Sequence, residues 1–196
     1  GRLTAAAYAA LERLTAAGLK VVPVTGRPAG WCDLVARVWP VAAVVGENGA
    51  LWYAHDHATR RMRRHHAQEE ATRLANRARL ETLAAAAMRA VPGARIAADQ
   101  PFRAFDIAVD FAEDAGPLPI AAAERIAAVF HAGGAEAKVS SIHVNAWIGA
   151  WDKLSGLRHL FAALWQPLDA VLDRVAYLGD SPNDAPLFAA VPLSVG

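Results

Sequence analysis

The segment 179–184, Gly-Asp-Ser-Pro-Asn-Asp, holds the residues best suited to chemistry and directly follows the apolar run 175–178. Its two carboxylates, Asp180 and Asp184, are four residues apart. In sheets of parallel strands flanked by helices, ligands bind at the carboxyl ends of the strands. Mg²⁺ prefers a few hard oxygen ligands and takes substrate phosphate as a further one. The segment predicts a Mg²⁺ site with Asp180 and Asp184 as ligands, and the alternative is an Asp-rich turn that caps a helix.

A second candidate, Thr25-Gly26-Arg27, lies between the apolar run 20–25 and a helix that we expect at about 28–38. A hydroxyl beside the backbone N–H groups of a helix N-terminus makes a site for an anion. The alternative is an ordinary turn between a strand and a helix.

Lys153 is the third candidate. The chain has three lysines, at positions 20, 138 and 153, and its other cations are arginines. A lysine at the start of a helix opposes the helix dipole. A compact ammonium group held against a phosphate would explain its presence, and a solvated surface lysine is the alternative.

The elements that position these residues alternate between strands and helices. Strands are predicted at 20–25, 41–45 and 175–178, and helices at 3–17, 28–38 and 153–165. This alternation is typical of a parallel sheet covered by helices. Between the two halves the pattern changes to α-β-β-α-β-β, with expected elements at 58–90, 94–98, 104–111, 117–132, 135–140 and 142–148. We therefore expect two core segments, 1–53 and 151–196, and an inserted domain at 54–150.

Composition narrows the class of protein. The chain has 196 residues, a net charge of +1 and one cysteine. These values exclude an internal disulfide framework and a multi-cysteine zinc site, and they argue against nucleic acid as the main partner. No apolar run is long enough to span a membrane, and no secretory signal is present. The sequence therefore predicts a cytoplasmic globular protein, and it gives no indication of oligomeric state.

Taken together, these motifs resemble those of a known family. Thr25, Lys153 and the 179–184 segment occur in this order, each at a strand end or helix start, and Gly46–Ala50 reads Gly-Glu-Asn-Gly-Ala. The sequence thereby resembles the haloacid dehalogenase (HAD) superfamily of phosphatases. It is most similar to subfamily IIB, which includes Cof-type and sucrose-phosphate-phosphatase-like enzymes. The resemblance implies an α/β fold with a Rossmann-like parallel-sheet core and an inserted C2B-type α+β cap.

The resemblance also implies the activity and the site. It implies Mg²⁺-dependent hydrolysis of a small phosphomonoester through an aspartyl-phosphate, with Asp180 and Asp184 holding the metal. Thr25, Lys153 and Asn183 would be catalytic. The polar face of the cap would look down on the catalytic centre and suit a sugar phosphate. The implied substrate-binding residues are Gly26, Arg27, Asn48, Lys138, His143 and Asn145.

The family's first motif, Asp-x-Asp-Gly-Thr, which carries the nucleophile, is absent from the chain. The sequence starts with Gly1, and we expect it to be a fragment whose nucleophilic strand lies upstream. That strand would be central in the family's sheet, so its neighbours would lack backbone partners on one side. The alternatives are a pseudoenzyme that binds a phosphosugar without catalysis and a phosphomutase of the same fold.

Overall fold

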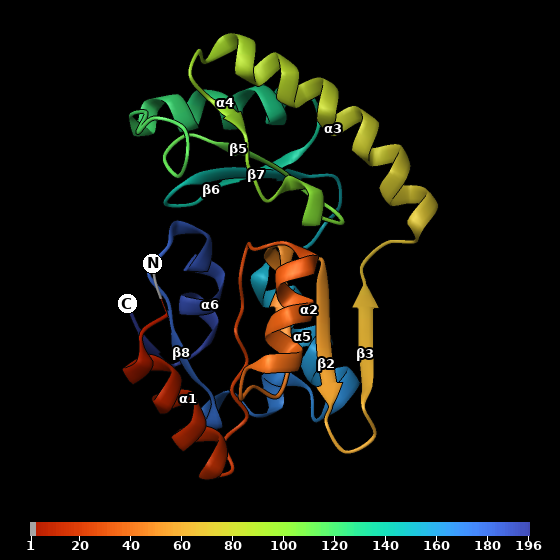
Figure 1. Cartoon of the computed structure of the whole chain (residues 1–196), viewed down its shortest axis with the longest axis vertical. Coiled ribbons are helices and arrows are strands. Elements are labelled where there is room, and N and C mark those ends of the chain that lie inside the picture. Colours follow the sequence, from red (N-terminus) through yellow and green to blue (C-terminus); the bar gives the residue numbers. More distant parts are fainter. Residues whose placement is uncertain (1–2) are drawn as a thin grey trace.

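The chain folds into a core and a cap that lies over one end of it (Figure 1). The computed structural model describes residues 3–196. The first half of the core contains α1 (Ala5–Ala16), α2 (Ala29–Val38), β1 (Val44–Gly46), η1 (Glu47–Gly49), β2 (Leu51–Asp56) and β3 (Arg61–His66). The second half contains α5 (Lys153–Leu164), η3 (Leu168–Ala170), η4 (Leu172–Arg174), β8 (Ala176–Leu178), η5 (Pro182–Asp184), α6 (Ala185–Ala190) and β9 (Leu193–Val195).

The core sheet has two parts. β1, β2 and β3 form an antiparallel sheet in that order. The extended residues 21–25 run parallel to β1, since the N–H of Thr25 donates to the carbonyl of Val45 and the N–H of Val45 donates to that of Pro23. β8 and β9 form a separate parallel pair. The predicted parallel alternation is confirmed for these segments, and the α/β class is confirmed for the chain.

The segment 58–66 differs from its predicted helix. β3 pairs with β2 along its whole length, from Asp56 opposite Arg61 to Leu51 opposite His66. The arginines and histidines of this segment therefore lie on an edge strand of the core sheet. The pattern gave no helix-breaking residue, and the pairing with β2 overrides the local preference. The helix α3 covers only Glu70–Ala90, and residues 54–66 belong with the core instead of the inserted domain.

The cap has the predicted element order. Its elements are α3, β4 (Arg95–Ile96), η2 (Gln100–Phe102), β5 (Ile107–Asp110), α4 (Ile120–Ala132), β6 (Glu136–Val139) and β7 (His143–Trp147). The antiparallel sheet has the order β4-β5-β7-β6. Alternation along the strands puts Val109 and Val144 into the buried cluster with Leu80, Ile126 and Phe130 of the two helices. The opposite face of the sheet turns toward the core (Figure 1).

Two glycines let α5 approach η1 closely. Gly49 has φ +108°, and a Cβ on it would collide with the carbonyl of Asp152. A Cβ on Gly156 would collide with Gly49. Asp152 begins α5 with a capping box, in which its side chain accepts the N–H of Ser155 at 2.7 Å. This packing brings the start of α5 against the Glu47–Gly49 turn.

A helix that spans a bilayer needs about 20 consecutive, predominantly apolar residues. Within residues 3–196, no helix is both long enough and apolar enough to cross a membrane.

Candidate active site

Lys153 lies at the centre of the candidate site. Its side chain is buried at the start of α5, and its Nζ donates to Asn183 Oδ1 at 3.0 Å and to Asp184 Oδ1 at 2.5 Å. Asn183 Nδ2 in turn donates to Asn48 Oδ1 at 2.9 Å. Four residues predicted from sequence, contributed by α5, η5 and η1, therefore form one chain of hydrogen bonds.

Asp184 organises the loop in which it lies. Its Oδ2 accepts the backbone N–H groups of Asp180 at 3.1 Å and of Ser181 at 3.0 Å. Burial alone would raise the pKa of Asp184, but the hydrogen bonds from Lys153 and Tyr177 and the charge of Lys153 together outweigh burial, and the pKa is lowered. Both oxygens of Asp184 are thus engaged with the protein. The carboxylate of Asp180 is exposed at the end of β8 and has no bonding partner in the described part of the chain.

The Thr25-Gly26-Arg27 turn lies beside this cluster. Thr25 Oγ1 accepts the N–H of Arg27 at 3.0 Å, and the Thr25 carbonyl accepts the N–H of Asn48 at 3.1 Å. Gly26 lies against the Asn48 side chain, because a Cβ there would stand 3.2 Å from Asn48 Oδ1. The turn therefore follows its strand into the site as predicted, and its small glycine leaves room for the amide of Asn48.

A cavity of about 170 Å³ lies between this cluster and the cap. The core lines it with Asn48, Asp152, Lys153 and Asn183, and the cap lines it with Lys138 of β6 and Trp147 of β7. Lys138 is the predicted cap residue that reaches the cavity. Trp147 is not among the predicted substrate-binding residues, although it shares a strand face with His143 and Asn145.

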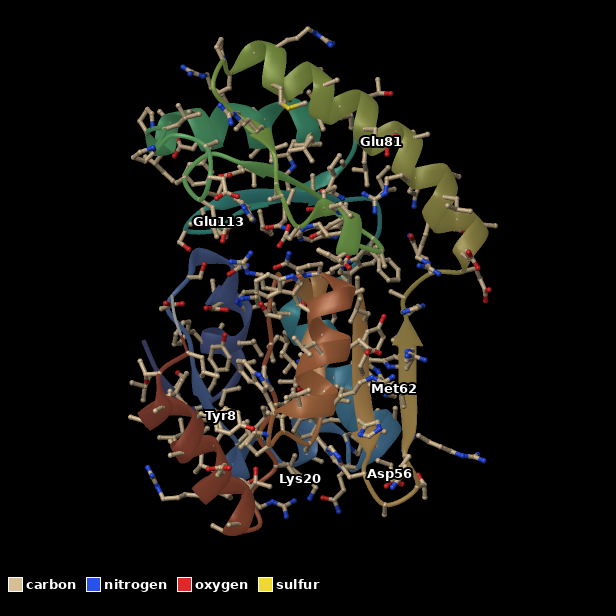
Figure 2. All side chains as sticks on the ribbon, viewed as in Figure 1. Tyr8, Lys20, Asp56, Met62, Glu81 and Glu113 are labelled. Carbon is tan, nitrogen blue, oxygen red and sulfur yellow. The ribbon has the colours of Figure 1, made fainter. Side chains whose placement is uncertain are left out.

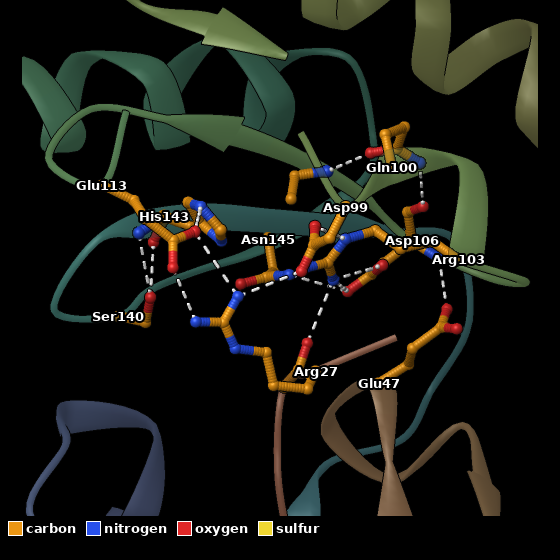
Figure 3. A network of polar contacts seen from close by, with 12 residues as sticks. Arg27, Glu47, Asp99, Gln100, Arg103, Asp106, Glu113, Ser140, His143 and Asn145 are labelled. Carbon is orange, nitrogen blue, oxygen red and sulfur yellow. Dashed lines mark hydrogen bonds and ion pairs between the residues drawn. The ribbon is translucent and has the colours of Figure 1, made fainter. Parts of the chain in front are cut away.

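The other three predicted substrate-binding residues lie in a partly buried network of polar contacts between cap and core (Figure 3). Arg27 contacts Asp99 at 3.1 Å and Glu113 at 2.7 Å, and both acids are in the cap. Figure 2 shows Glu113 on the underside of the cap, facing the core. His143 Nε2 lies 2.9 Å from Glu113 Oε2, and Asn145 Nδ2 donates to an oxygen of Asp106 at 2.8 Å. None of the three lines the cavity.

Arg103 is the centre of this network and was missed from sequence. Its guanidinium is fully buried and binds Asp99 and Asp106 at 2.9–3.1 Å. Its Nη1 also donates to the carbonyl of Gly26 at 3.0 Å. The spacing offered a signal, since Arg103 follows Asp99 by four residues and precedes Asp106 by three. The contact ties the cap directly to the turn that follows Thr25.

Glu47 is a second connection that sequence analysis missed. Its fully buried carboxylate accepts four backbone N–H groups at 2.6–3.0 Å. One belongs to Ala29 at the start of α2, and the others belong to Ala104, Phe105 and Asp106 of the cap. The sequence feature that could have indicated this role is that Glu47 is an acid within the apolar stretch 41–54. The carboxylate holds core and cap together through their main chains (Figure 3).

Glu47 gives the folding stability a testable pH dependence. Burial, followed by repulsion from Asp106, raises the pKa of Glu47 from 4.5 to about 7, against the effect of its backbone hydrogen bonds. Between those pH values the unfolded chain holds fewer protons, so the free energy of unfolding falls as pH rises, by about 3 kcal/mol. The variant Glu47→Gln is expected to lack this slope. Urea unfolding at pH 5, 6, 7 and 8 measures it.

The control for that series is Glu81→Gln, which changes an exposed glutamate on α3. It is expected to keep the slope of the unsubstituted chain. Identical slopes in all three proteins would show that Glu47 titrates at the same pH whether the chain is folded or unfolded.

The donor set was tested against Mg²⁺. Among residues 3–196, no group of three or more His, Cys, Asp or Glu side chains could hold a metal ion. Mg²⁺, however, is commonly held by one or two carboxylates together with waters and substrate phosphate. The free carboxylate of Asp180, beside a loop that Asp184 fixes, suits one ligand position of such a site.

Comparison with known proteins bears on the fold. No family model and no curated protein matches the sequence. Solved structures do match. A protein of Thermoplasma acidophilum aligns with a TM-score of 0.68 and 16% identity, over 97% of this chain and 74% of that one.

Two further matches carry functional names. The sucrose-phosphatase of Synechocystis, solved with sucrose and phosphate, aligns with a TM-score of 0.60 and 14% identity, over 95% of this chain and 73% of that one. A sugar phosphatase of HAD subclass IIB aligns with a TM-score of 0.58 and 14% identity, over 95% and 76%. The chain therefore has the fold of HAD phosphatases of subclass IIB, as the sequence motifs predicted.

Proposed function

We propose that this chain carries most of the active site of a Mg²⁺-dependent phosphatase that hydrolyses a small phosphomonoester, with sugar phosphates as the first class to test. The observation that carries the proposal is the hydrogen-bonded chain from Asn48 through Asn183 and Lys153 to Asp184, at the edge of a cavity under the cap. The HAD-type fold and the sugar-phosphate phosphatases among its structural neighbours support it.

The residues present suit phosphoryl transfer, in which catalysis is mostly positioning and charge stabilisation. Lys153 has a third N–H to place on a phosphoryl oxygen, because Asn183 and Asp184 take only two. The hydroxyl of Thr25 can donate to the same group. Asp180 would hold the metal, with Asp184 fixing the loop from behind. When bound, Mg²⁺ supplies Lewis-acid stabilisation of the phosphoryl charge.

The nucleophile would come from outside the chain as given. Residues 21–25 pair with β1 on one side only, and β8 pairs with β9 on one side only, within the described residues. Val24 and Tyr177 of these two segments pack against the same core cluster. We place between them a strand from upstream of Gly1 that carries an aspartate. Its carboxylate oxygen bonds to phosphorus, the ester P–O bond breaks, and the leaving oxygen takes up one proton and departs as the alcohol. Water then attacks the phosphorus of the acyl phosphate, which releases inorganic phosphate, the free carboxylate and one proton.

The test starts with the coding region upstream of Gly1. The extended chain is expressed, and release of phosphate from a panel of sugar phosphates is measured with and without Mg²⁺. Asp180→Ala is expected to lower kcat on the order of 100-fold or more, since it removes a charge from the phosphoryl site. The matched control is Asp173→Asn, an exposed aspartate of η4.

Three results would contradict the proposal. If no aspartate-bearing segment lies upstream, the chain is a phosphosugar-binding module without catalysis. If phosphate passes to an added sugar instead of water, the enzyme is a phosphomutase. If Asp180→Ala turns over as fast as Asp173→Asn, the metal is held elsewhere.

A further inference from the structure

The cavity under the cap has side-chain acceptors that are already occupied. Asn48 Oδ1 accepts from Asn183, and Asn183 Oδ1 accepts from Lys153. Asp152 also lines the cavity, and one of its two carboxylate oxygens, Oδ1, accepts the N–H of Ser155 as the cap of α5. A ligand that needs to donate hydrogen bonds therefore finds few side-chain partners among these residues.

The donors around the same cavity are unused. Asn48 Nδ2 and Trp147 Nε1 are buried and have no hydrogen-bond partner in the described part of the chain. The Lys138 side chain forms neither a hydrogen bond nor an ion pair there. Buried donors without partners are rare in folded proteins and call for an explanation. Lys138 and Trp147 belong to the cap, whereas the residues predicted to bind the phosphoryl group belong to the core.

The carboxylates of the cap are not available to balance Lys138. Asp106 is held by Arg103 and Asn145, and Asp110 accepts four backbone N–H groups from residues 112–115. Glu113 faces Arg27 and His143. Glu136 is on the same strand as Lys138, but no ion pair forms between them in residues 3–196. The cap therefore offers the cavity a positive charge that pairs with no carboxylate in residues 3–196, and Asp152 of the core is the acid in the cavity lining.

The cavity is also small. Its volume of about 170 Å³ is below the roughly 300–1,000 Å³ of typical ligand pockets. Each hydroxyl of a neutral polyol accepts hydrogen bonds but also has one to donate, and the free side-chain acceptors of this cavity are few. An ionised carboxylate or phosphate group brings only acceptors.

We propose that the substrate is a short phosphomonoester whose alcohol carries a second anionic group, a carboxylate or a phosphate. Lys138 and the indole N–H of Trp147 bind this second group, while Lys153 and Asn48 bind the phosphoryl group. The inference rests on the proposed phosphatase function and narrows its substrate class. It makes Lys138 and Trp147 specificity-determining residues of the cap.

The test uses a matched pair of ligands and the extended chain, with its upstream aspartate changed to asparagine to prevent turnover, in isothermal titration calorimetry with Mg²⁺. 3-Phosphoglycerate and glycerol 3-phosphate differ by a carboxylate in place of a hydroxymethyl group. We expect the acid to bind at least about 10-fold more tightly, since hydrogen bonds between charged groups are the strong ones. Glycerol 1,3-bisphosphate, measured in parallel, shows whether a phosphate serves as well as a carboxylate.

Substitutions of Lys138 and Trp147 test whether these cap residues cause the tighter binding of the acid. Lys138→Met is expected to remove the preference for the acid, and it leaves the contacts within the chain intact because the exposed Lys138 side chain bonds to nothing among the described residues. Trp147→Phe keeps the ring and removes the N–H, and we expect it to reduce the preference in part. Lys20→Met is the control, since Lys20 lies over the Trp165 ring, away from the cavity lining.

The outcomes separate this inference from the function on which it rests. Equal binding of the acid and the neutral ester would overturn the anionic substrate class and leave the phosphatase proposal standing. A preference that survives in Lys138→Met would overturn the assignment to the cap. If inorganic phosphate and all three esters fail to bind, both proposals are contradicted.

Discussion

Replacing Arg103 with methionine is expected to lower the free energy of unfolding by about 3–5 kcal/mol, a cost typical of removing one partner from a buried ion pair. Arg103 is fully buried, and it contacts two acids that are themselves buried, Asp99 and Asp106. Without the guanidinium, both carboxylates remain away from water, and Asp106 also repels Glu47. Methionine fills a similar volume, so the loss reports charge and hydrogen bonding more than packing.

The effect reaches the site because Arg103 also donates to the carbonyl of Gly26. Urea unfolding followed by tryptophan fluorescence measures the stability, with Trp147 and Trp151 stacked near the junction of cap and core. Arg89→Met changes an exposed arginine at the end of α3 and is expected to stay within about 0.5 kcal/mol. An equally small loss in Arg103→Met would show that the acids are stabilised without it.

The variant Arg103→Lys separates the effect of the positive charge from that of the guanidinium geometry. Lysine keeps the charge but lacks the planar fork that reaches Asp99, Asp106 and Gly26 at once. We expect it to recover less than half of the stability that methionine loses. Full recovery would mean that charge alone, without geometry, holds the cap to the core.

Short motifs at strand ends and helix starts pointed to residues that the structure brings together. Lys153, Asn183, Asp184 and Asn48 form one chain of hydrogen bonds, and their roles in a site stay a prediction. The same reasoning failed at 61–66. That segment has no strand signature of its own, and it is a strand because β2 offers six residues of pairing.

The contacts between cap and core could not be predicted from the sequence for a related reason. Arg27 meets Glu113 from 86 positions away, and Glu47 meets Phe105 from 58 positions away. Strand alternation placed His143 and Asn145 on the correct polar face. Strand alternation could not show that His143 contacts Glu113 and that Asn145 donates to Asp106 within the chain itself. Face and register follow from local pattern, whereas partners follow from tertiary packing.

Lys153→Met is expected to abolish phosphate binding and to cost about 3–5 kcal/mol of stability at pH 7, because Asp184 becomes a buried carboxylate without its cation. The pH dependence identifies the cause. In the unsubstituted chain the pKa of Asp184 is lowered, so its contribution is present above the unfolded pKa and is lost as pH falls through the folded pKa. The variant lacks the hydrogen bond and the charge of Lys153 that lower this pKa, so the loss of stability between pH 7 and pH 4 is expected to be smaller than in the unsubstituted chain.

A double-mutant cycle with Asp184→Asn separates the ion pair from the packing of each side chain. If the pair acts as a unit, the double variant loses less than the sum of the two single variants, with a coupling of about 0.5–3 kcal/mol. Urea unfolding at pH 4 and pH 7 supplies the four free energies, and titration with inorganic phosphate supplies the binding readout. Additive losses with phosphate binding retained would mean that Lys153 faces neither Asp184 nor the ligand. Phosphate binding would then have to be assigned to Asn48 and Thr25 without Lys153.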